Sequence, residues 1–224
     1  FWGFQFIRKS EKSMIYTCMA RETAHQLGTP VSSLMGWIKL LRDQKSETSS
    51  ILSAMDDDVS RLSEISERFS KIGSNPKLKT ITIYDLLSKS INYMQNRLPK
   101  YSKIGLTLRG NRDIRIQGDW TLFRWAIENI LKNSIDAIGS GGGNISVNIE
   151  SKKKSSSILI TDSGKGIPRK DWKNIFRPGF SSKRRGWGLG LSLTMRIIKE
   201  IHHGDIRVLR SRSEETIFQI MLPV

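Results

Sequence analysis

The sequence has little of the residue types that build disulfides and metal sites: its 224 residues include one cysteine, Cys18, and three histidines. A single cysteine excludes an internal disulfide and is typical of a reducing compartment. The chain also lacks a long hydrophobic run, because the seven mostly apolar residues at its start are far fewer than the roughly 20 that span a bilayer. With only three histidines, each one has to be interpreted from its neighbours.

Acidic residues are in the minority: 21 Asp and Glu stand against 37 Lys and Arg, for a formal net charge of +16. A surplus of this size predicts an anionic partner, whether nucleic acid, a membrane surface, a nucleotide or an acidic protein. The basic residues are scattered apart from short clusters at 152–154 and 183–185, and aromatic residues do not alternate with them. This distribution disfavours direct binding of nucleic acid.

The first eleven residues form a segment of their own. In "FWGFQFIRKSEK", which has no initiator methionine, an aromatic stretch precedes Arg8, Lys9 and Lys12. This order is typical of the cytoplasmic exit of a transmembrane helix, although an apolar first turn of a soluble helix fits the same residues. We therefore expect residues 1–11 to be a juxtamembrane segment of a longer protein.

Two amphipathic helices are expected next. From residue 12 to residue 42, and again from about 51 to 72, apolar residues recur at helical spacing. These positions are Ala20, Ala24, Leu27, Val31, Leu34, Ile38 and Leu41 in the first helix, and Met55, Val59, Leu62, Ile65 and Phe69 in the second. The polar stretch "DQKSETSS" joins the helices into a hairpin. Because one hairpin buries only one apolar seam, we expect two chains to pair as a homodimeric four-helix bundle.

The pattern of apolar and polar residues changes after "GSNPK" at 73–77, which breaks the second helix and marks a domain boundary. Alternating apolar and polar residues predict strands at 79–84, 104–109 and 114–118. The segments 143–150 and 156–163 are expected to form a hairpin around "SKKKS", and two C-terminal strands are expected at 204–210 and 216–223. Helical patterns occupy 84–101, 120–138 and 189–201. Helices gathered on one face of a mixed sheet predict that an α/β sandwich follows the helical hairpin.

The first stretch with a chemical interpretation is "ENILKNSIDA", in which Asn129 and Asn133 lie four residues apart on one helix. At that spacing both amides project from the same face. An amide oxygen is a hard neutral ligand that suits Mg²⁺ bridging two phosphates. Two asparagines on a helix surface would have the same spacing, so this stretch alone does not decide between a site and a surface.

Two glycine-rich stretches follow. In "TDSGKGIP" (161–168), Asp162 ends a strand, and Gly164 and Gly166 let the backbone pass close to a ligand. A buried carboxylate there would accept a hydrogen bond from the exocyclic amine of adenine, although an ordinary turn uses the same residues. In "GWGLGL" (186–191), glycines at the start of a helix would expose N–H groups to phosphates. The basic segment between the two stretches is typical of a flap that closes over a nucleotide.

In this order, the three stretches resemble the Bergerat ATP-binding fold of gyrase-type ATPases, MutL-type proteins and sensor histidine kinases. With "AHQLGTP" (24–30) upstream, the chain from about residue 8 to residue 224 is similar to a two-component sensor histidine kinase. The resemblance implies an ATP site in which Asn133 binds Mg²⁺. Its ATP-binding residues would be Asn129, Asn133, Asp136, Asp162, Gly164, Gly166, Ile167, Phe176, Phe180, Lys183, Arg184, Gly186, Gly188, Leu189 and Gly190.

The same resemblance implies that His25 is the phosphoacceptor. Neutral imidazole is nucleophilic at physiological pH, so a ring nitrogen of His25 would attack the γ-phosphate of ATP. The phosphoryl group would then pass to an aspartate on the receiver domain of a response regulator. Pro30, one turn downstream, removes a backbone hydrogen bond and is expected to bend the helix. Thr29, on the face of His25, would position the water that dephosphorylates the receiver domain.

Two positions depart from common patterns in ways that affect the chemistry. Gln26 follows His25 where many family members carry an acid, so we expect either that Glu22, one turn earlier, takes up the proton or that autophosphorylation is slow. Asn129 stands where gyrase-type ATPases place a glutamate that activates water, and an amide cannot act as a general base. The site is therefore expected to hold ATP without readily hydrolysing it.

We therefore predict the core of a bacterial protein-histidine kinase, with a dimerisation and phosphoacceptor domain at 12–73 and a catalytic ATP-binding domain at 74–224. It would lie on the cytoplasmic side of the inner membrane, attached through an upstream transmembrane segment, and would not bind nucleic acid. A phosphatase-biased or degenerate kinase stays open because of Gln26, whereas Asn129 disfavours an ATPase clamp of the same fold. His202 and His203 are expected to be structural or solvent-exposed.

Overall fold

The computed structural model describes residues 20, 23–24, 26–42, 48–73, 76–99, 102–152, 155–182 and 188–223. The chain divides into two units, Phe1–Asn75 and Pro76–Val224. The expected juxtamembrane segment at 1–11 and the candidate residues Glu22, His25, Lys183, Arg184 and Gly186 lie outside the described residues. Within the described part of the chain, no helix combines the length and the apolar character that crossing a membrane requires.

The first unit contains two helices, as the apolar spacing predicts. Residues 26–42 are helical without a break at Pro30, and α2 spans Thr48–Gly73. A partly buried polar contact joins the two helices, because Nε1 of Trp37 donates to Oδ2 of Asp58 at 3.0 Å. Arg61 lies 3.6 Å from the other carboxylate oxygen of Asp58, which is only 6% exposed. The buried charge of Asp58 is thus compensated by a hydrogen bond and an ion pair.

Part of each predicted apolar seam stays exposed in the single chain. The exposed fractions are 44% for Val31, 42% for Ile38, 54% for Val59 and 41% for Phe69. One hairpin therefore does not bury all of its large apolar side chains, in agreement with the physical reason for expecting a bundle of two hairpins.

The second unit is a mixed α/β domain. Its strands are β1 (Lys79–Thr82), β2 (Ile104–Gly110), β3 (Arg115–Gly118), β4 (Gly143–Lys152), β5 (Ser155–Asp162), β6 (Asp205–Arg212) and β7 (Glu215–Pro223). Its longer helices are α3 (Ile83–Arg97), α4 (Trp120–Ile138) and α5 (Gly190–Arg196), which continues as the π-helical turn η4 (Ile197–Ile201). The short turns η1 (Gly139–Gly141), η2 (Arg169–Asp171) and η3 (Asn174–Phe176) lie in the connections.

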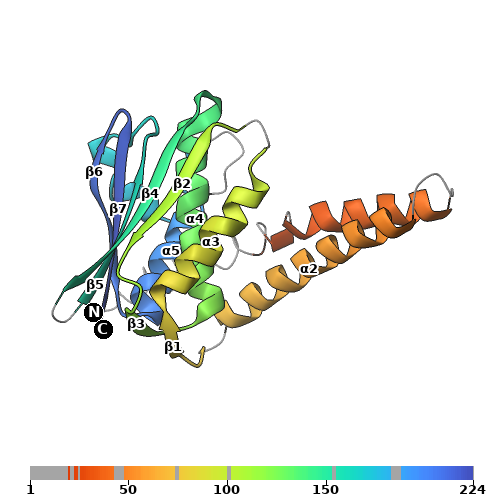
Figure 1. Cartoon of the computed structure of the whole chain (residues 1–224), viewed down its shortest axis with the longest axis horizontal. Coiled ribbons are helices and arrows are strands. Elements are labelled where there is room, and N and C mark those ends of the chain that lie inside the picture. The colour runs from red at the N-terminus through yellow and green to blue at the C-terminus, as the bar shows by residue number, and fades with distance from the viewer. Residues whose placement is uncertain are drawn as a thin grey trace, which may run out of the picture. The chain divides into compact units, whose positions relative to one another are not determined.

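Five strands form one mixed sheet in the order β2-β4-β5-β7-β6, with β2 and β4 parallel and the other neighbours antiparallel. Helices α3, α4 and α5 lie on one face of this sheet (Figure 1), which confirms the predicted α/β sandwich. Fully buried Leu86, Phe123, Ile127 and Ile160 form part of the core between the two layers. Strands β1 and β3 pair separately as an antiparallel ribbon, which strand periodicity did not predict because it specifies faces and not partners.

Two helix ends differ from the prediction. Helix α3 ends at Arg97 rather than at residue 101, because Pro99 disfavours helical geometry at the residue before it. That residue, Leu98, has an extended conformation with φ of −68° and ψ of 141°. The last helix reaches Ile201 as predicted, but its final residues form a π turn rather than an α turn.

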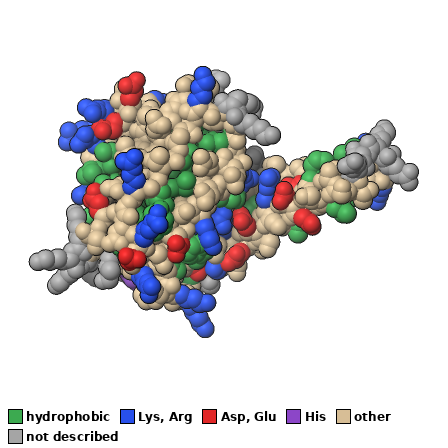
Figure 2. Space-filling view, in the orientation of Figure 1, with side chains coloured by type: hydrophobic (Ala, Val, Ile, Leu, Met, Phe, Trp, Pro, Cys, Tyr) green, Lys and Arg blue, Asp and Glu red, His purple; other side chains and the backbone are tan. Residues whose placement is uncertain are grey.

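Charges of both signs are mixed on the surface. Figure 2 shows Lys and Arg side chains interspersed with Asp and Glu on the face that it draws. Some basic residues are paired, as in the contacts of Arg210 and Arg212 with Glu215 at 3.2 and 3.1 Å. This face presents a mixed electrostatic surface rather than a basic stripe, in line with the scattered basic residues of the sequence.

The π turn positions His202, which is a structural histidine with 2% of its surface exposed. Its Nδ1 lies 2.9 Å from the carbonyl oxygen of Ile197, and its Nε2 accepts the N–H of Asp119 at 3.1 Å. Nδ1 therefore carries the proton of a neutral ring. Burial lowers the pKa of His202, and this effect outweighs the raising influence of Ile197 and Asp119. The ring packs on Phe123 with 5.0 Å between centroids, so it connects the last helix to the start of α4.

We predict that His202 makes the stability of the second unit depend on pH. Because its pKa is lower in the folded chain than in the unfolded chain, the unfolded chain binds more protons below about pH 6.5, and the free energy of unfolding falls. The contribution is at most about 1.4 kcal/mol per pH unit, and urea unfolding between about pH 7.5 and about pH 5.5 would measure it. The exposed neighbour provides the control variant, His203→Asn, in which the free energy of unfolding should change with pH as it does in the native chain. If the free energy of unfolding of His202→Gln fell with pH as steeply as that of the native chain, the prediction would be contradicted.

Candidate functional site

The site is centred on Asp162, at the end of β5. Its carboxylate is 2% exposed, and each oxygen has a partner. Oδ2 accepts the hydroxyl of Ser134 from α4 at 2.9 Å, and Oδ1 accepts the N–H of Gly164 at 2.9 Å. Burial raises the pKa of Asp162, and the two hydrogen bonds oppose the rise. The result is a buried acceptor whose direction is fixed by α4 on one side and, on the other, by the first glycine-rich stretch, residues 161–168, which is called the glycine stretch below.

Ser134 contacts Asp162 within the candidate site, which the sequence did not indicate. It directly follows Asn133 in "ENILKNSIDA", and nothing in that local stretch distinguishes it from a serine on a helix surface. Its contact with Asp162 joins residues 28 positions apart. A buried hydroxyl next to a buried carboxylate is visible only once α4 packs against β5, so the tertiary structure was needed to find it.

The glycines of the second stretch are required by close packing of the chain on itself. A Cβ at Gly164 would lie 2.6 Å from the Cβ of Ala137 on α4. Gly166 has φ of +82°, and a Cβ there would lie 2.5 Å from the carbonyl oxygen of Arg212. The backbone of the stretch therefore approaches α4 and the end of β6 closely, and its approach to a ligand stays a prediction.

The two asparagines of α4 make different contacts. Nδ2 of Asn129 donates to the carbonyl oxygen of Gly190 at 3.2 Å, which ties α4 to the start of α5. The same carbonyl accepts the hydroxyl of Thr194 at 2.8 Å. Nδ2 of Asn133 donates to the backbone carbonyl of Asn129 at 2.9 Å, which sets the orientation of its amide. Asp136, one turn further along α4, is exposed.

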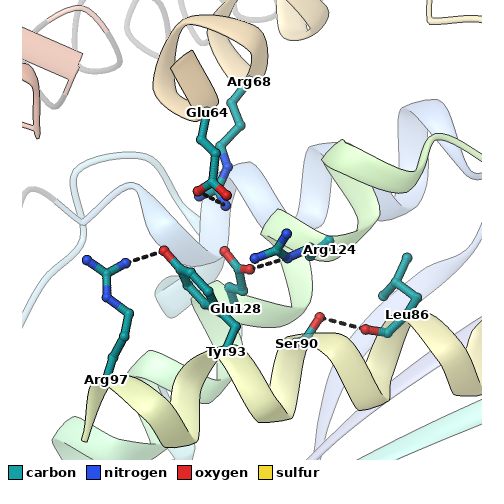
Figure 3. A network of polar contacts seen from close by, with 8 residues as sticks. All are labelled: Glu64, Arg68, Leu86, Ser90, Tyr93, Arg97, Arg124 and Glu128. Atoms are coloured by element: carbon teal, nitrogen blue, oxygen red, sulfur yellow. Dashed lines mark hydrogen bonds and ion pairs between the residues drawn. The ribbon is translucent and has the colours of Figure 1, made fainter. Parts of the chain in front are cut away.

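Glu128, which directly precedes Asn129 in the sequence, already forms an ion pair. Figure 3 shows Glu128 joined to Arg124, one turn earlier on α4, and their side chains lie next to Tyr93 of α3. The Nε–Oε1 distance of the pair is 2.7 Å, and Glu128 is 6% exposed. The guanidinium of Arg124 lies 4.7 Å from the centroid of the Tyr93 ring. Glu128 is therefore a member of an α3–α4 packing network.

The described parts of the flap are anchored at both ends. At its start, Nε1 of Trp172 donates to the carbonyl oxygen of Ile167 at 3.0 Å. At its far end, the N–H of Gly179 donates to the carbonyl oxygen of Gly188 at 3.2 Å, and Gly188 has φ of +66°. The flap residues 183–187 lie outside the described residues.

The two candidate phenylalanines of the flap differ in burial. Phe176 is 7% exposed and packs edge-on against Phe218, with centroids 6.5 Å apart, so it belongs to the core. Phe180 is half-buried. Leu189, just before α5, is 6% exposed and is also part of the core.

The candidate residues of the first unit can be placed only in part. Thr29 is exposed and Gln26 is half-buried on the helix at 26–42. His25 and Glu22 lie outside the described residues. Among the described candidates of the second unit, the structure joins Asn129 to Gly190 at the start of α5, and Asp162 to Gly164 at the glycine stretch beside α4.

Comparison with known proteins gives two family matches that divide the chain. The model for the His Kinase A (phospho-acceptor) domain matches residues 19–75. The model for histidine kinase-, DNA gyrase B- and HSP90-like ATPases matches residues 118–224.

Curated relatives match nearly the whole chain. Sporulation kinase B of Bacillus subtilis is 31% identical over 96% of this chain and 51% of its own length. Sporulation kinase C of the same organism is 26% identical over 97% of this chain and 51% of its own length. Sensor histidine kinase ZraS of Salmonella typhimurium is 28% identical over 97% of this chain and 48% of its own length. The chain thus spans about half the length of these relatives.

Solved structures match the fold. The nucleotide-free catalytic domain of histidine kinase ThkA has a TM-score of 0.60 and 26% identity over 66% of this chain and 96% of its own. ThkA in complex with the response regulator protein TrrA has a TM-score of 0.60 and 21% identity over 99% of this chain and 65% of its own.

Proposed function

Because the chain belongs to the two-component sensor histidine kinase family, we propose that it transfers the γ-phosphoryl group of ATP to His25 and then to an aspartate of a response regulator. The observation that carries the proposal is the buried carboxylate of Asp162, held by Ser134 and Gly164. An acceptor of fixed direction in a buried setting suits the recognition of adenine.

Asp162 provides the base selectivity. Adenine presents an exocyclic amine donor where guanine presents a carbonyl acceptor. With one bond to each carboxylate oxygen already made, the remaining lone pairs of Asp162 are acceptors only. They favour the amine of adenine and repel the carbonyl of guanine.

We assign the divalent ion of the site to Asn133. Its amide nitrogen donates to the carbonyl of Asn129, so the amide has a defined orientation and a carbonyl oxygen of the kind that Mg²⁺ prefers. A bound Mg²⁺ would supply positive charge that offsets the negative charge of the phosphates. The other residues that we assign to the nucleotide are those named from the sequence, with the glycine stretch at 164–166 and the flap enclosing it.

The contacts of α4 favour phosphoryl transfer over hydrolysis. Asn129 holds the carbonyl of Gly190, and an amide does not accept a proton from water. Glu128 is bound to Arg124 within the α3–α4 network. Neither side chain is set to activate water, so the γ-phosphoryl group would be kept for a histidine.

At His25 the transfer forms an N–P bond while the bond between the γ-phosphorus and the β–γ bridging oxygen of ATP breaks, and ADP leaves with that oxygen. The ring nitrogen proton must pass to a base. Gln26 offers a carbonyl that can hold the ring N–H, but it cannot take up the proton. We therefore assign that role to Glu22, one helical turn before His25.

Replacing Glu22 tests this assignment. Loss of a general base lowers a rate by about 100-fold or more, so Glu22→Gln should slow autophosphorylation by about that factor at saturating ATP. The initial rate of label incorporation from γ-labelled ATP would measure it. Glu67→Gln on α2, whose carboxylate makes a surface pair with Lys71, is the matched control. An unchanged rate in Glu22→Gln would exclude Glu22 as the base.

The partners follow from the first unit. We propose that two chains form a homodimer in which the exposed Val31, Ile38 and Val59 are covered. Exposed Thr29 is assigned to dephosphorylation of the receiver domain, and the solved complex of ThkA with a response regulator supports a partner of that class. We further propose attachment to the cytoplasmic side of the inner membrane through a segment upstream of residue 1.

One experiment tests the proposed function against an ATPase of the same fold. The chain is incubated with γ-labelled ATP and Mg²⁺, and both protein-bound label and released phosphate are followed. We expect label that is lost in acid and kept in base, with little free phosphate. Steady release of phosphate without protein-bound label would overturn the kinase proposal and favour the ATPase.

A further inference from the structure

The hairpin between β6 and β7 supports the glycine stretch that carries Asp162. We propose that Ser211, on β6, is a positioning residue of the nucleotide site, whose hydroxyl holds this stretch in the shape that presents Asp162. The inference rests on the proposed function for the identity of the ligand. The contacts that carry it lie within the second unit.

Ile167, at the end of the glycine stretch, is held through both of its backbone polar groups. Its N–H donates to Oγ of Ser211 at 2.7 Å, and its carbonyl oxygen accepts Nε1 of Trp172 at 3.0 Å. A 2.7 Å contact is short for a bond between an amide and a hydroxyl. Ile167 is therefore fixed between β6 on one side and the start of the flap on the other.

The hydroxyl of Ser211 is itself oriented. Ser211 and Thr216 are cross-strand partners in the β6–β7 pair, and their side-chain oxygens are 2.9 Å apart. Thr216 is 2% exposed, and Ser211 is half-buried. With Thr216 as a second partner, Oγ of Ser211 is held in position to accept from Ile167 and does not rotate freely.

Two further contacts join the same hairpin to the glycine stretch. The N–H of Glu214, a turn residue with φ of +63°, donates to the carbonyl oxygen of Gly164 at 2.9 Å. The carbonyl oxygen of Arg212 approaches Gly166 so closely that only glycine fits there. The backbone of the stretch is thus shaped by the β6–β7 hairpin at three successive points, Gly164, Gly166 and Ile167.

The connection to Asp162 runs through Gly164. The N–H of Gly164 donates to Oδ1 of Asp162, while its carbonyl oxygen accepts from Glu214. A shift of the glycine stretch therefore changes the direction of the carboxylate that would meet adenine. Removing the hydroxyl of Ser211 releases one of the three points of attachment, and the half-buried N–H of Ile167 loses its partner.

The test compares nucleotide affinity in three variants of the whole chain. A non-hydrolysable ATP analogue with Mg²⁺ is titrated calorimetrically into Ser211→Ala, Ser211→Thr and Ser213→Ala. Loss of one hydrogen bond should raise the Kd of Ser211→Ala by about 3- to 10-fold. Ser211→Thr keeps the hydroxyl and should stay within about twofold of the native chain. Ser213→Ala changes an exposed serine of the same hairpin and is the matched control.

Amide hydrogen exchange gives a second readout that a general loss of stability would not reproduce. In Ser211→Ala we expect faster exchange at Ile167 and Gly164, with the core strand β5 unchanged. An affinity in Ser211→Ala equal to that of the native chain would overturn the inference, and so would unchanged exchange at Ile167. If the native chain binds no nucleotide, the proposed function fails, and the exchange measurement still decides whether Ser211 holds the stretch.

Discussion

Replacement of Asp162 by asparagine is expected to lower the affinity for ATP by about 30- to 150-fold while the second unit stays folded. In the native chain both carboxylate oxygens are acceptors, one bound to Gly164 and the other to Ser134. Asparagine can keep the bond from the N–H of Gly164 through its oxygen and can donate its amide to Ser134. The amide then presents a donor to the amine of adenine, so an attraction becomes a repulsion.

The stability of this variant separates the loss of a ligand contact from a loss of fold. Because burial raises the pKa of Asp162, the ionised carboxylate costs stability at neutral pH, and asparagine removes that cost. The free energy of unfolding of Asp162→Asn is therefore expected to equal or exceed that of the native chain. Calorimetric titration with an ATP analogue and urea unfolding would measure both quantities. Asp113→Asn, an exposed change in the same unit, is the control.

Either of two results would contradict the role of Asp162. Unchanged ATP affinity would mean that the carboxylate does not meet the base. A large loss of stability would mean that Asp162 holds α4 and β5 together and that any loss of affinity is indirect.

Replacement of His25 by glutamine is expected to abolish phosphorylation of the chain while ATP binding is unchanged. A glutamine amide is similar in polarity but has no nucleophilic nitrogen, so no phosphoramidate bond can form. Incubation with γ-labelled ATP, followed by acid and base treatment of the protein, would measure the effect. His203→Gln, at an exposed position of the second unit, should label as well as the native chain.

The result for the native chain decides between an active histidine kinase and a phosphatase-biased or degenerate member of the family. Acid-labile label that disappears in His25→Gln would establish the phosphoacceptor and would make Gln26 a tolerated variation. Label that persists in His25→Gln would refute the assignment. A native chain that binds ATP but takes up no label would indicate a phosphatase-biased or degenerate kinase.

Much of the fold could be predicted because its elements carry strong local patterns. The helix at Trp120–Ile138 was predicted with the bounds that the structure shows, since Asp119 caps its start and Gly139 ends it with φ of +70°. Strands β2 and β4 of the central sheet alternate apolar and polar residues, and β5 carries a short apolar run at 158–160. The β1–β3 ribbon was not predicted as a pair, because its strands have four residues each and lie on either side of α3.

The candidate site likewise contains some residues that local sequence indicates and others that only contacts between distant segments reveal. The sequence identified Asp162 and the glycines as candidates because a carboxylate between a strand and a glycine turn is a local arrangement. Ser134, Ser211 and Glu214 were not identified, since each acts through a contact with a segment at least 28 residues away in the sequence. The contact of Asn129 with the carbonyl of Gly190, 61 residues further along the chain, was not predictable from the sequence for the same reason.

What the sequence determined by itself is the set of elements and the chemistry available to them: an amphipathic helical hairpin, a mixed sheet with helices, and a carboxylate, amides and glycines in one order. These features depend on the periodicity of side chains and on the torsional preferences of single residues, which act over a few positions. Only the tertiary structure decided which group each polar atom meets. Hydrogen-bond partners of buried atoms depend on the packing of distant segments, so the support of Asp162 by α4 and by the β6–β7 hairpin became visible only in the folded chain.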